Sequence, residues 1–358
     1  MLSSIKYSKN KMTQTLKIGS ILLLLYLLPA CDLSDSENYN QVVIDSTSVY
    51  LVNIENDRTT KIIDGENPMF IPNTNKILYR DVDKIYSLDL ITTENKYISD
   101  MPGSSLHLYK KMYLSKNGHY VSFSANGGNH NNDLYLASTI TGGSVNVTNS
   151  PLRWESEGIF FNNDSKLMYS EFVSDEKGNL KYYGISIIEL FGNNFVFLDS
   201  NKSPIGFSQD ERYAVFSYSW SSSTSKGTIF YIYDMFNSSI QDTILVENVD
   251  TFNGPSLSND MKVYYSANES NIYRLDLVTK DIDLLWSGTI TRDYKFSPDF
   301  KMVLVNHGNY LELINLETSQ SKNYFLNESS KIYFGEPCFS EDGKSFLIAR
   351  SYHDEYFN

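Results

Sequence analysis

The chain has 358 residues, of which 43 are acidic and 30 are basic, and its formal net charge is −13. Such an acidic surface argues against binding to nucleic acid and against broad contact with anionic lipid, because both are themselves negative. The only cysteines are Cys31 and Cys338. A lipid on Cys31 leaves no intramolecular disulfide. Cys338 lies inside a strand phrase, and we expect it to be a small buried hydrophobe.

Residues 1–30 have the composition of a secretory leader. They contain four lysines and no acidic residue, and an apolar run covers residues 18–28. That run is short for a membrane span and is typical of a signal peptide. It ends at Leu28-Pro29-Ala30-Cys31, which resembles the processing site of bacterial lipoproteins. The resemblance implies cleavage after Ala30 and diacylglyceryl attachment to the Cys31 sulfur. An ordinary signal peptide and a later start at Met12 stay open.

Residues 31–46 form an acidic tether that charge and small polar residues should keep disordered. Removal of the leader's four lysines changes the net charge from −13 to −17. Stable membrane attachment needs two or more acyl chains. We therefore expect a lipid-anchored protein of the cell envelope, in the outer rather than the inner membrane. The leaflet stays open, because acidic residues after the lipidated cysteine are read differently in different bacteria.

One short phrase then recurs seven times. Each copy has an apolar residue, usually a small polar residue, any residue, and Asp or Asn, and an apolar strand follows. The steps between copies are 44, 47, 46, 50, 39 and 43 residues. That period, filled with strand-like segments, predicts an all-β chain with a single β-propeller and one blade per repeat. The copies are Phe70–Asn73, Leu114–Asn117, Phe161–Asp164, Phe207–Asp210, Leu257–Asp260, Phe296–Asp299 and Phe339–Asp342.

The phrase has the chemistry of a hairpin turn. The Asp or Asn side chain can accept the backbone N–H two residues on. Gly118 and Gly343 follow directly in two copies, where a positive φ suits glycine.

A second strand phrase follows in six repeats, and the last repeat lacks it. Val49–Ile54 is this same phrase without a first half. We infer that N-terminal strands complete the C-terminal blade, which would remove the free sheet edges of the ring. The prediction is a propeller over residues 47–358, with seven blades of four antiparallel strands. A six-bladed ring with an irregular segment stays open.

The repeats resemble those of TolB-like propellers, which are relatives of WD-repeat blades. Leu114–Gly118, Val121–Ser124 and Asn132–Tyr135 carry the resemblance best. The resemblance covers residues 47–358 and implies the fold. TolB proteins also carry an α/β domain ahead of the propeller, for which the preceding residues are too few. A role in the Tol system is therefore not expected.

Ligands of propellers usually bind where the loops entering the inner strands meet the loops between the second and third strands. The entering loops contribute Glu66, Lys111, Trp154, Glu155, Arg292, Asp293 and Glu336, and the other loops contribute Asp81, His130, Trp220, His307 and Arg350. Trp154 and Trp220 are candidate platforms for a sugar ring or a partner side chain. The candidate ligand or partner face consists of Trp154, Glu155, Trp220, Arg292, Asp293, Glu336 and Arg350.

No sequence motif for a nucleophile elbow or a phosphate-binding loop is present. Oligogalacturonate lyases are propellers that hold a metal through histidines, but no histidine directly precedes a repeated phrase. We therefore expect no metal, no cofactor, and a non-enzymatic binding or scaffold module for an envelope protein or glycan. The alternative is a polysaccharide lyase or hydrolase in which Glu155 and Asp293 supply acid–base groups. An accessory subunit of an envelope complex is a third hypothesis.

Overall fold

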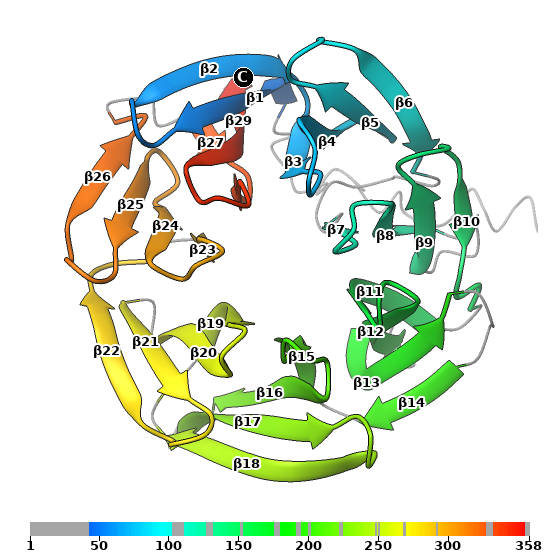
Figure 1. The fold of residues 1–358 in the computed structure, drawn as a ribbon, viewed down its shortest axis with the longest axis vertical. Coiled ribbons are helices and arrows are strands. Elements are labelled where there is room, and N and C mark those ends of the chain that lie inside the picture. The colour runs from blue at the N-terminus through cyan, green and yellow to red at the C-terminus, as the bar shows by residue number, and fades with distance from the viewer. Residues whose placement is uncertain are drawn as a thin grey trace, which may run out of the picture. The chain divides into compact units, whose positions relative to one another are not determined.

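Seven antiparallel sheets are arranged around one axis (Figure 1). The structure, a computed structural model, describes residues 43–101, 111–126, 132–150, 153–174, 180–190, 195–199, 202–221, 225–247, 249, 251–267, 270–290, 293–326 and 332–354. Residues 44–354 form one compact unit, and of the other unit, 1–43 with 355–358, only Val43 is described. Every regular element in these ranges is a strand. The described residues therefore include no helix that could cross a membrane. The predicted all-β propeller of seven blades is confirmed.

Blades 1 to 6 each follow the chain from the inner strand to the outer one. Blade 1 has β3 (Glu66–Phe70), β4 (Lys76–Asp81), β5 (Lys84–Asp89) and β6 (Asn95–Asp100). Blade 2 has β7 (Met112–Leu114), β8 (Tyr120–Asn126), β9 (Asn132–Ser138) and β10 (Ser144–Asn146). Blade 3 has β11 (Arg153–Phe161), β12 (Lys166–Ser174), β13 (Leu180–Glu189) and β14 (Phe195–Asp199).

Blades 4 to 6 repeat this arrangement. Blade 4 has β15 (Ser203–Phe207), β16 (Tyr213–Ser221), β17 (Lys226–Asp234) and β18 (Ser239–Glu247). Blade 5 has β19 (Thr251–Leu257), β20 (Lys262–Ala267), β21 (Asn271–Asp276) and β22 (Ile282–Ser287). Blade 6 has β23 (Asp293–Phe296), β24 (Met302–Asn306), β25 (Leu311–Asn315) and β26 (Ser321–Tyr324).

Blade 7 joins the two ends of the chain. The C-terminal part supplies β27 (Ile332–Phe334), β28 (Cys338–Phe339) and β29 (Ser345–Asp354). The N-terminal part supplies β1 (Val43–Asn53), which lies beside β29, and β2 (Arg58–Asp64) at the outer edge. The predicted ring closure is therefore confirmed, although β1 begins at Val43, four residues before the predicted start of the propeller.

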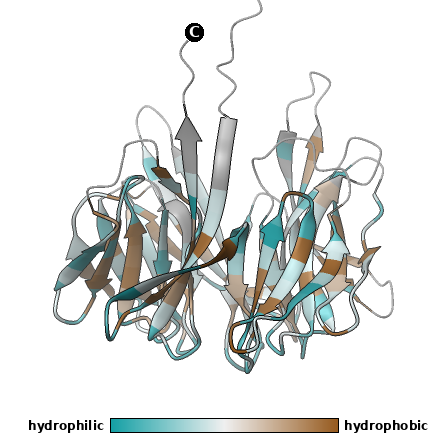
Figure 2. Cartoon of the chain, turned by 90° about the horizontal axis from the view of Figure 1, so that it is seen from above, coloured by the Kyte–Doolittle hydropathy of each residue, from teal (hydrophilic) through white to brown (hydrophobic). Residues whose placement is uncertain are grey.

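The hydrophobic core is divided among the seven interfaces between neighbouring blades. Each of seven buried clusters draws its side chains from two adjacent blades. Val49 and Val52 of β1, both fully buried, belong to the clusters of blades 7/1 and 6/7 respectively. Figure 2, a side view, shows hydrophobic residues interspersed with hydrophilic ones along the strands. Because the N-terminal strand packs on both sides, it closes the ring by hydrophobic contact as well as by strand pairing.

The turns of the repeated phrase have the predicted hydrogen bonds. Asp299 Oδ1 accepts the Lys301 backbone N–H at 3.1 Å, and Asp342 Oδ1 accepts that of Lys344 at 3.0 Å. The serine of the phrase adds a second bond, since Ser297 Oγ accepts the Met302 N–H at 2.9 Å. Gly118 and Gly343 have φ of 72° and 69°, as expected.

Blade 3 departs from this pattern, and its turn contacts the neighbouring blade. Asn162, Asn163 and Asp164 all have positive φ, which Asn and Asp tolerate better than most residues. The buried Asp164 carboxylate accepts the backbone N–H groups of Lys116 and Asn117 of blade 2, each at 3.0 Å. This carboxylate therefore joins two blades by capping the turn of one with the turn of the next.

Replacing Asp164 with alanine should lower the free energy of unfolding by about 2 kcal/mol, because two partly buried backbone N–H groups lose a charged acceptor. Denaturant unfolding monitored by circular dichroism measures the change. Asp299→Ala is the comparison, because that exposed carboxylate bonds only within its own turn and should cost less. Equal effects of the two substitutions would contradict a role for Asp164 in joining the blades.

Candidate functional site

The innermost strands have irregularities that direct side chains toward the central channel. In blade 1 the register between β3 and β4 shifts between Glu66 and Met69. In blade 7 the inner strand is interrupted between β27 and β28, where Glu336 and Pro337 lie. Proline has no N–H to donate and is tolerated in edge strands and bulges. These interruptions therefore suit strands that face the channel rather than another blade.

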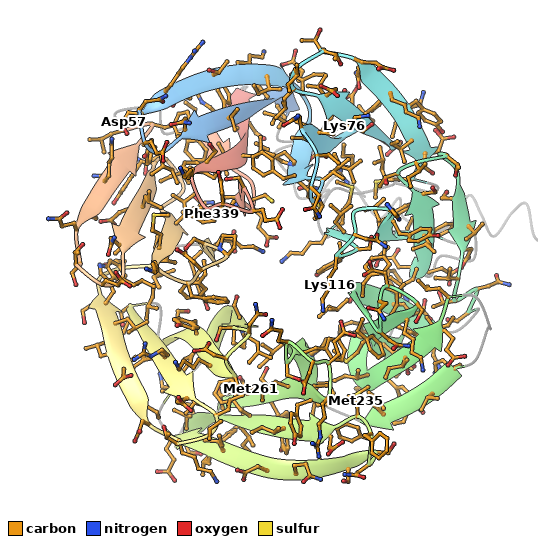
Figure 3. The ribbon with its side chains drawn as sticks, viewed as in Figure 1. Asp57, Lys76, Lys116, Met235, Met261 and Phe339 are labelled. Carbon is orange, nitrogen blue, oxygen red and sulfur yellow. The ribbon has the colours of Figure 1, made fainter. Side chains whose placement is uncertain are left out.

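A cavity of about 360 Å³ lies among the inner strands of blades 1, 2, 3, 6 and 7. Much of its wall is apolar, with contributions from Met69, Met112, Leu114, Ile159 and Phe160. Its charged lining residues are Lys111, Lys116, Lys295 and Glu336. Figure 3 shows Lys116 and Phe339 near the inner edge of the ring and Asp57 at its outer edge.

Glu336 bridges two lysines from different blades. Its Oε2 lies 3.2 Å from Lys111 Nζ of blade 2, and its Oε1 lies 3.1 Å from Lys295 Nζ of blade 6. All three side chains are roughly half-exposed. One carboxylate therefore links blades 2, 6 and 7 at the cavity.

Burial and neighbouring charges act in opposite directions on the pKa values of Glu336 and Lys295. Burial in the channel wall opposes the charge of Glu336, but the Lys295 and Lys111 ammonium groups overcome it and hold the pKa of Glu336 at about 2. Burial likewise opposes the charge of Lys295, yet the Glu336 carboxylate raises the pKa of Lys295 above its usual value. Glu336 and Lys295 are therefore both charged at neutral pH.

Lys116 lies between this cavity and a second, more open hollow of about 920 Å³ at blades 3 and 4. Its ammonium group pairs with Glu211, which also accepts the backbone N–H of Asn162. These contacts fix the turns of blades 2, 3 and 4 to one another.

Of the predicted candidate face, Glu336 is the one member found among the described residues lining the 360 Å³ cavity. Asp293 is exposed at the start of β23, the strand that carries Lys295. Arg350 lies in blade 7 over the rings of Tyr50 and Phe325, at 5.7 and 5.9 Å. Arg292 and the lipidation and cleavage residues Cys31 and Ala30 lie outside the described residues.

The two candidate tryptophans belong to neighbouring blades, 3 and 4. Trp154 is half-buried in β11, opposite Phe172 of β12. Trp220 stacks on Tyr218 with ring centroids 6.4 Å apart, and its ring covers Gly227 on the paired strand. A Cβ on Gly227 would lie 2.4 Å from that ring. Trp220 therefore packs closely on its own blade.

Glu155 belongs to a buried polar network between blades 2 and 3. It is 2% exposed, Glu171 lies opposite it on β12, and Asp133 is buried nearby. Ser150 Oγ donates to Glu155 Oε1 at 2.5 Å. Burial raises the pKa of Glu155 to about 8, and the charges of Asp133 and Glu171 add to the rise while the Ser150 hydrogen bond opposes it. Asp293 lies in blade 6, so the structure does not assemble Glu155 and Asp293 as an acid–base pair.

The sequence prediction missed Lys295 and misjudged Cys338. Lys295 is exposed between the buried Tyr294 and Phe296, so the strand alternation alone directs it away from the core. Cys338, expected to be a buried small hydrophobe, is only half-buried and lines the cavity beside Glu336. Among the described residues, no group of three or more His, Cys, Asp or Glu side chains is arranged to hold a metal ion.

No family model matches the sequence, and no curated protein matches it. Solved structures do match. An oligogalacturonate lyase in complex with manganese is 12% identical, with a TM-score of 0.57, over 88% of this chain and 97% of that one. The oligogalacturonate lyase of Vibrio parahaemolyticus is 11% identical, with a TM-score of 0.58, over 88% and 100%. TolB from Acinetobacter baumannii is 14% identical, with a TM-score of 0.45, over 87% and 64%. At these identities the two oligogalacturonate lyase matches show a shared fold, and this chain is a seven-bladed β-propeller.

Proposed function

We propose that the protein is a non-enzymatic binding module of the cell envelope, anchored by lipid on Cys31, and that its ligand or partner segment occupies the channel cavity. The single observation that supports this is the cavity itself, which five blades line and which has a largely apolar wall with charged groups from three of those blades. Ligand sites in proteins commonly have this composition. At about 360 Å³, the cavity suits a small molecule or the tip of a partner chain rather than a folded domain.

The tether limits where such a module can act. Eleven residues separate Cys31 from Val43, the first residue of β1. Fully extended, they span about 40 Å. The propeller would therefore stay close to the membrane that holds the lipid, and its ligand or partner would be another component of the envelope.

The test is affinity capture of the lipidated protein from its native envelope after mild crosslinking. We expect Leu114→Trp, which places an indole in the cavity, to lose the captured protein or glycan. Val278→Trp is the matched control, since Val278 is 76% exposed on an outer turn of blade 5. Thermal unfolding confirms that both variants fold. Equal capture by the wild type and both variants would contradict channel binding.

The alternative proposal is that the protein is a polysaccharide lyase or hydrolase. Incubation with oligogalacturonate and other acidic polysaccharides, with and without manganese, measures it through the release of unsaturated or reducing ends. Turnover that is lost in Leu114→Trp and kept in Val278→Trp would replace the binding-module proposal with an enzymatic one.

A further inference from the structure

We infer that the channel cavity takes an anionic ligand, a small organic carboxylate or phosphate ester, whose negative group binds Lys111 and Lys295 in place of or beside Glu336. This inference rests on the proposed function in one respect, that the channel is the ligand site. It adds the chemical class of the ligand.

The local charge is opposite in sign to that of the whole protein. The charged side chains among the described lining residues are three lysines and one glutamate, a formal sum of +2, which the pairing of Lys116 with Glu211 outside the cavity reduces to +1. The chain as a whole has a formal charge of −13. A cleft lined by one sign of charge raises the local concentration of oppositely charged ligands. An acidic protein with a positive cavity therefore favours an anion there and repels a cation.

The geometry around Glu336 matches that of a bound anion. One oxygen of its carboxylate faces Lys111 and the other faces Lys295. A ligand carboxylate or phosphate offers two oxygens in a similar arrangement. Each ammonium group has three N–H donors, so it can bind a ligand oxygen without losing every contact with Glu336. Glu336 thus acts as an internal competitor for the ligand's negative group.

The rest of the cavity calls for an apolar part on the ligand. Met69, Met112, Leu114 and Phe160 line it beside the charged trio. A ligand with a hydrocarbon body and one anionic group would satisfy both surfaces, whereas inorganic phosphate would satisfy the lysines alone. We therefore expect affinity to rise from inorganic phosphate to an aromatic or aliphatic phosphate or carboxylate.

The experiment is calorimetric titration of the full-length protein at constant ionic strength with phenyl phosphate, benzoate, inorganic phosphate and the uncharged benzyl alcohol. We expect phenyl phosphate and benzoate to bind at least about tenfold more tightly than benzyl alcohol. Lys111→Gln and Lys295→Gln should each weaken binding of these anions about tenfold, and Glu336→Gln should strengthen it about tenfold. Lys262→Gln is the charge-matched control, since Lys262 pairs with Asp260 on a turn of blade 5.

Two results would overturn the inference: benzyl alcohol binding as tightly as the anions, or Glu336→Gln weakening anion binding. The comparison with benzyl alcohol needs no variant, so it decides the matter even if a substitution prevents folding. Envelope capture that depends on Leu114 without any anion binding would refute the inference and leave the proposed function standing. Anion binding without channel-dependent capture would refute the proposed function instead.

Discussion

Replacing Val52 with aspartate should prevent the ring from closing and lower the free energy of unfolding by at least about 4 kcal/mol. Val52 is fully buried in β1 and packs with side chains of blades 6 and 7. A carboxylate there would lose its hydration, and the strand that completes blade 7 would lose its hydrophobic contacts. Thermal unfolding by circular dichroism and limited proteolysis measure the effect.

Thr59→Asp is the matched control for this experiment. Thr59 lies directly opposite Val52 on β2 and is exposed, so it receives the same charge in the same sheet without burial. We expect its unfolding to stay close to that of the wild type. A stable, protease-resistant Val52→Asp protein would mean that β1 does not close the ring.

The second large effect concerns pH. Because the pKa of Glu155 rises from 4.5 to about 8 in the folded protein, the folded state binds a proton that the unfolded state has already released. Stability from this group is therefore fully present below about pH 4.5 and is lost as pH rises through about 8. The slope reaches about 1.4 kcal/mol per pH unit between these values. Above pH 8 the folded protein would carry a buried carboxylate.

Glu155→Gln should remove this slope and make the protein more stable than the wild type at pH 9. Denaturant unfolding at a series of pH values gives the difference between the two proteins, which isolates Glu155 from the other titrating groups. Glu94→Gln, at an exposed turn of blade 1, is the control and should leave the slope unchanged. Parallel pH profiles for the wild type and Glu155→Gln would show that Glu155 is ionised in the folded state.

The blade number and ring closure are predictable from sequence for a local reason. Each repeat carries residues with a defined role in one turn, such as Ser297 and Asp299, and their spacing counts the blades. The unmatched half-repeat at Val49–Ile54 predicts the closure, because it supplies the strand phrase that the last repeat lacks. Each of these signals lies within a short stretch of sequence, so it can be recognised without knowledge of the three-dimensional arrangement.

The channel site is less predictable, because it depends on contacts between distant parts of the chain. The sequence places Glu336 and Lys111 in entering loops, but their contact with Lys295 requires the curvature of the ring and the interruption between β27 and β28. Trp220 shows a second limit of sequence reasoning. Its indole is a candidate ligand platform, and in the structure the glycine opposite it on β17 provides a surface on which the ring packs. Sequence alone does not show which side of a strand such a ring covers.

Site-specific photo-crosslinking in living cells tests the central claim most directly. A photoreactive side chain at Met69 would face the channel cavity, and the same group at Val278 would face solvent on an outer turn. Occupancy of the channel predicts a discrete adduct from position 69 that disappears when Leu114→Trp is added, and none from position 278. Adducts from position 278 alone, or adducts from position 69 that persist with Leu114→Trp, would contradict the channel as the binding site.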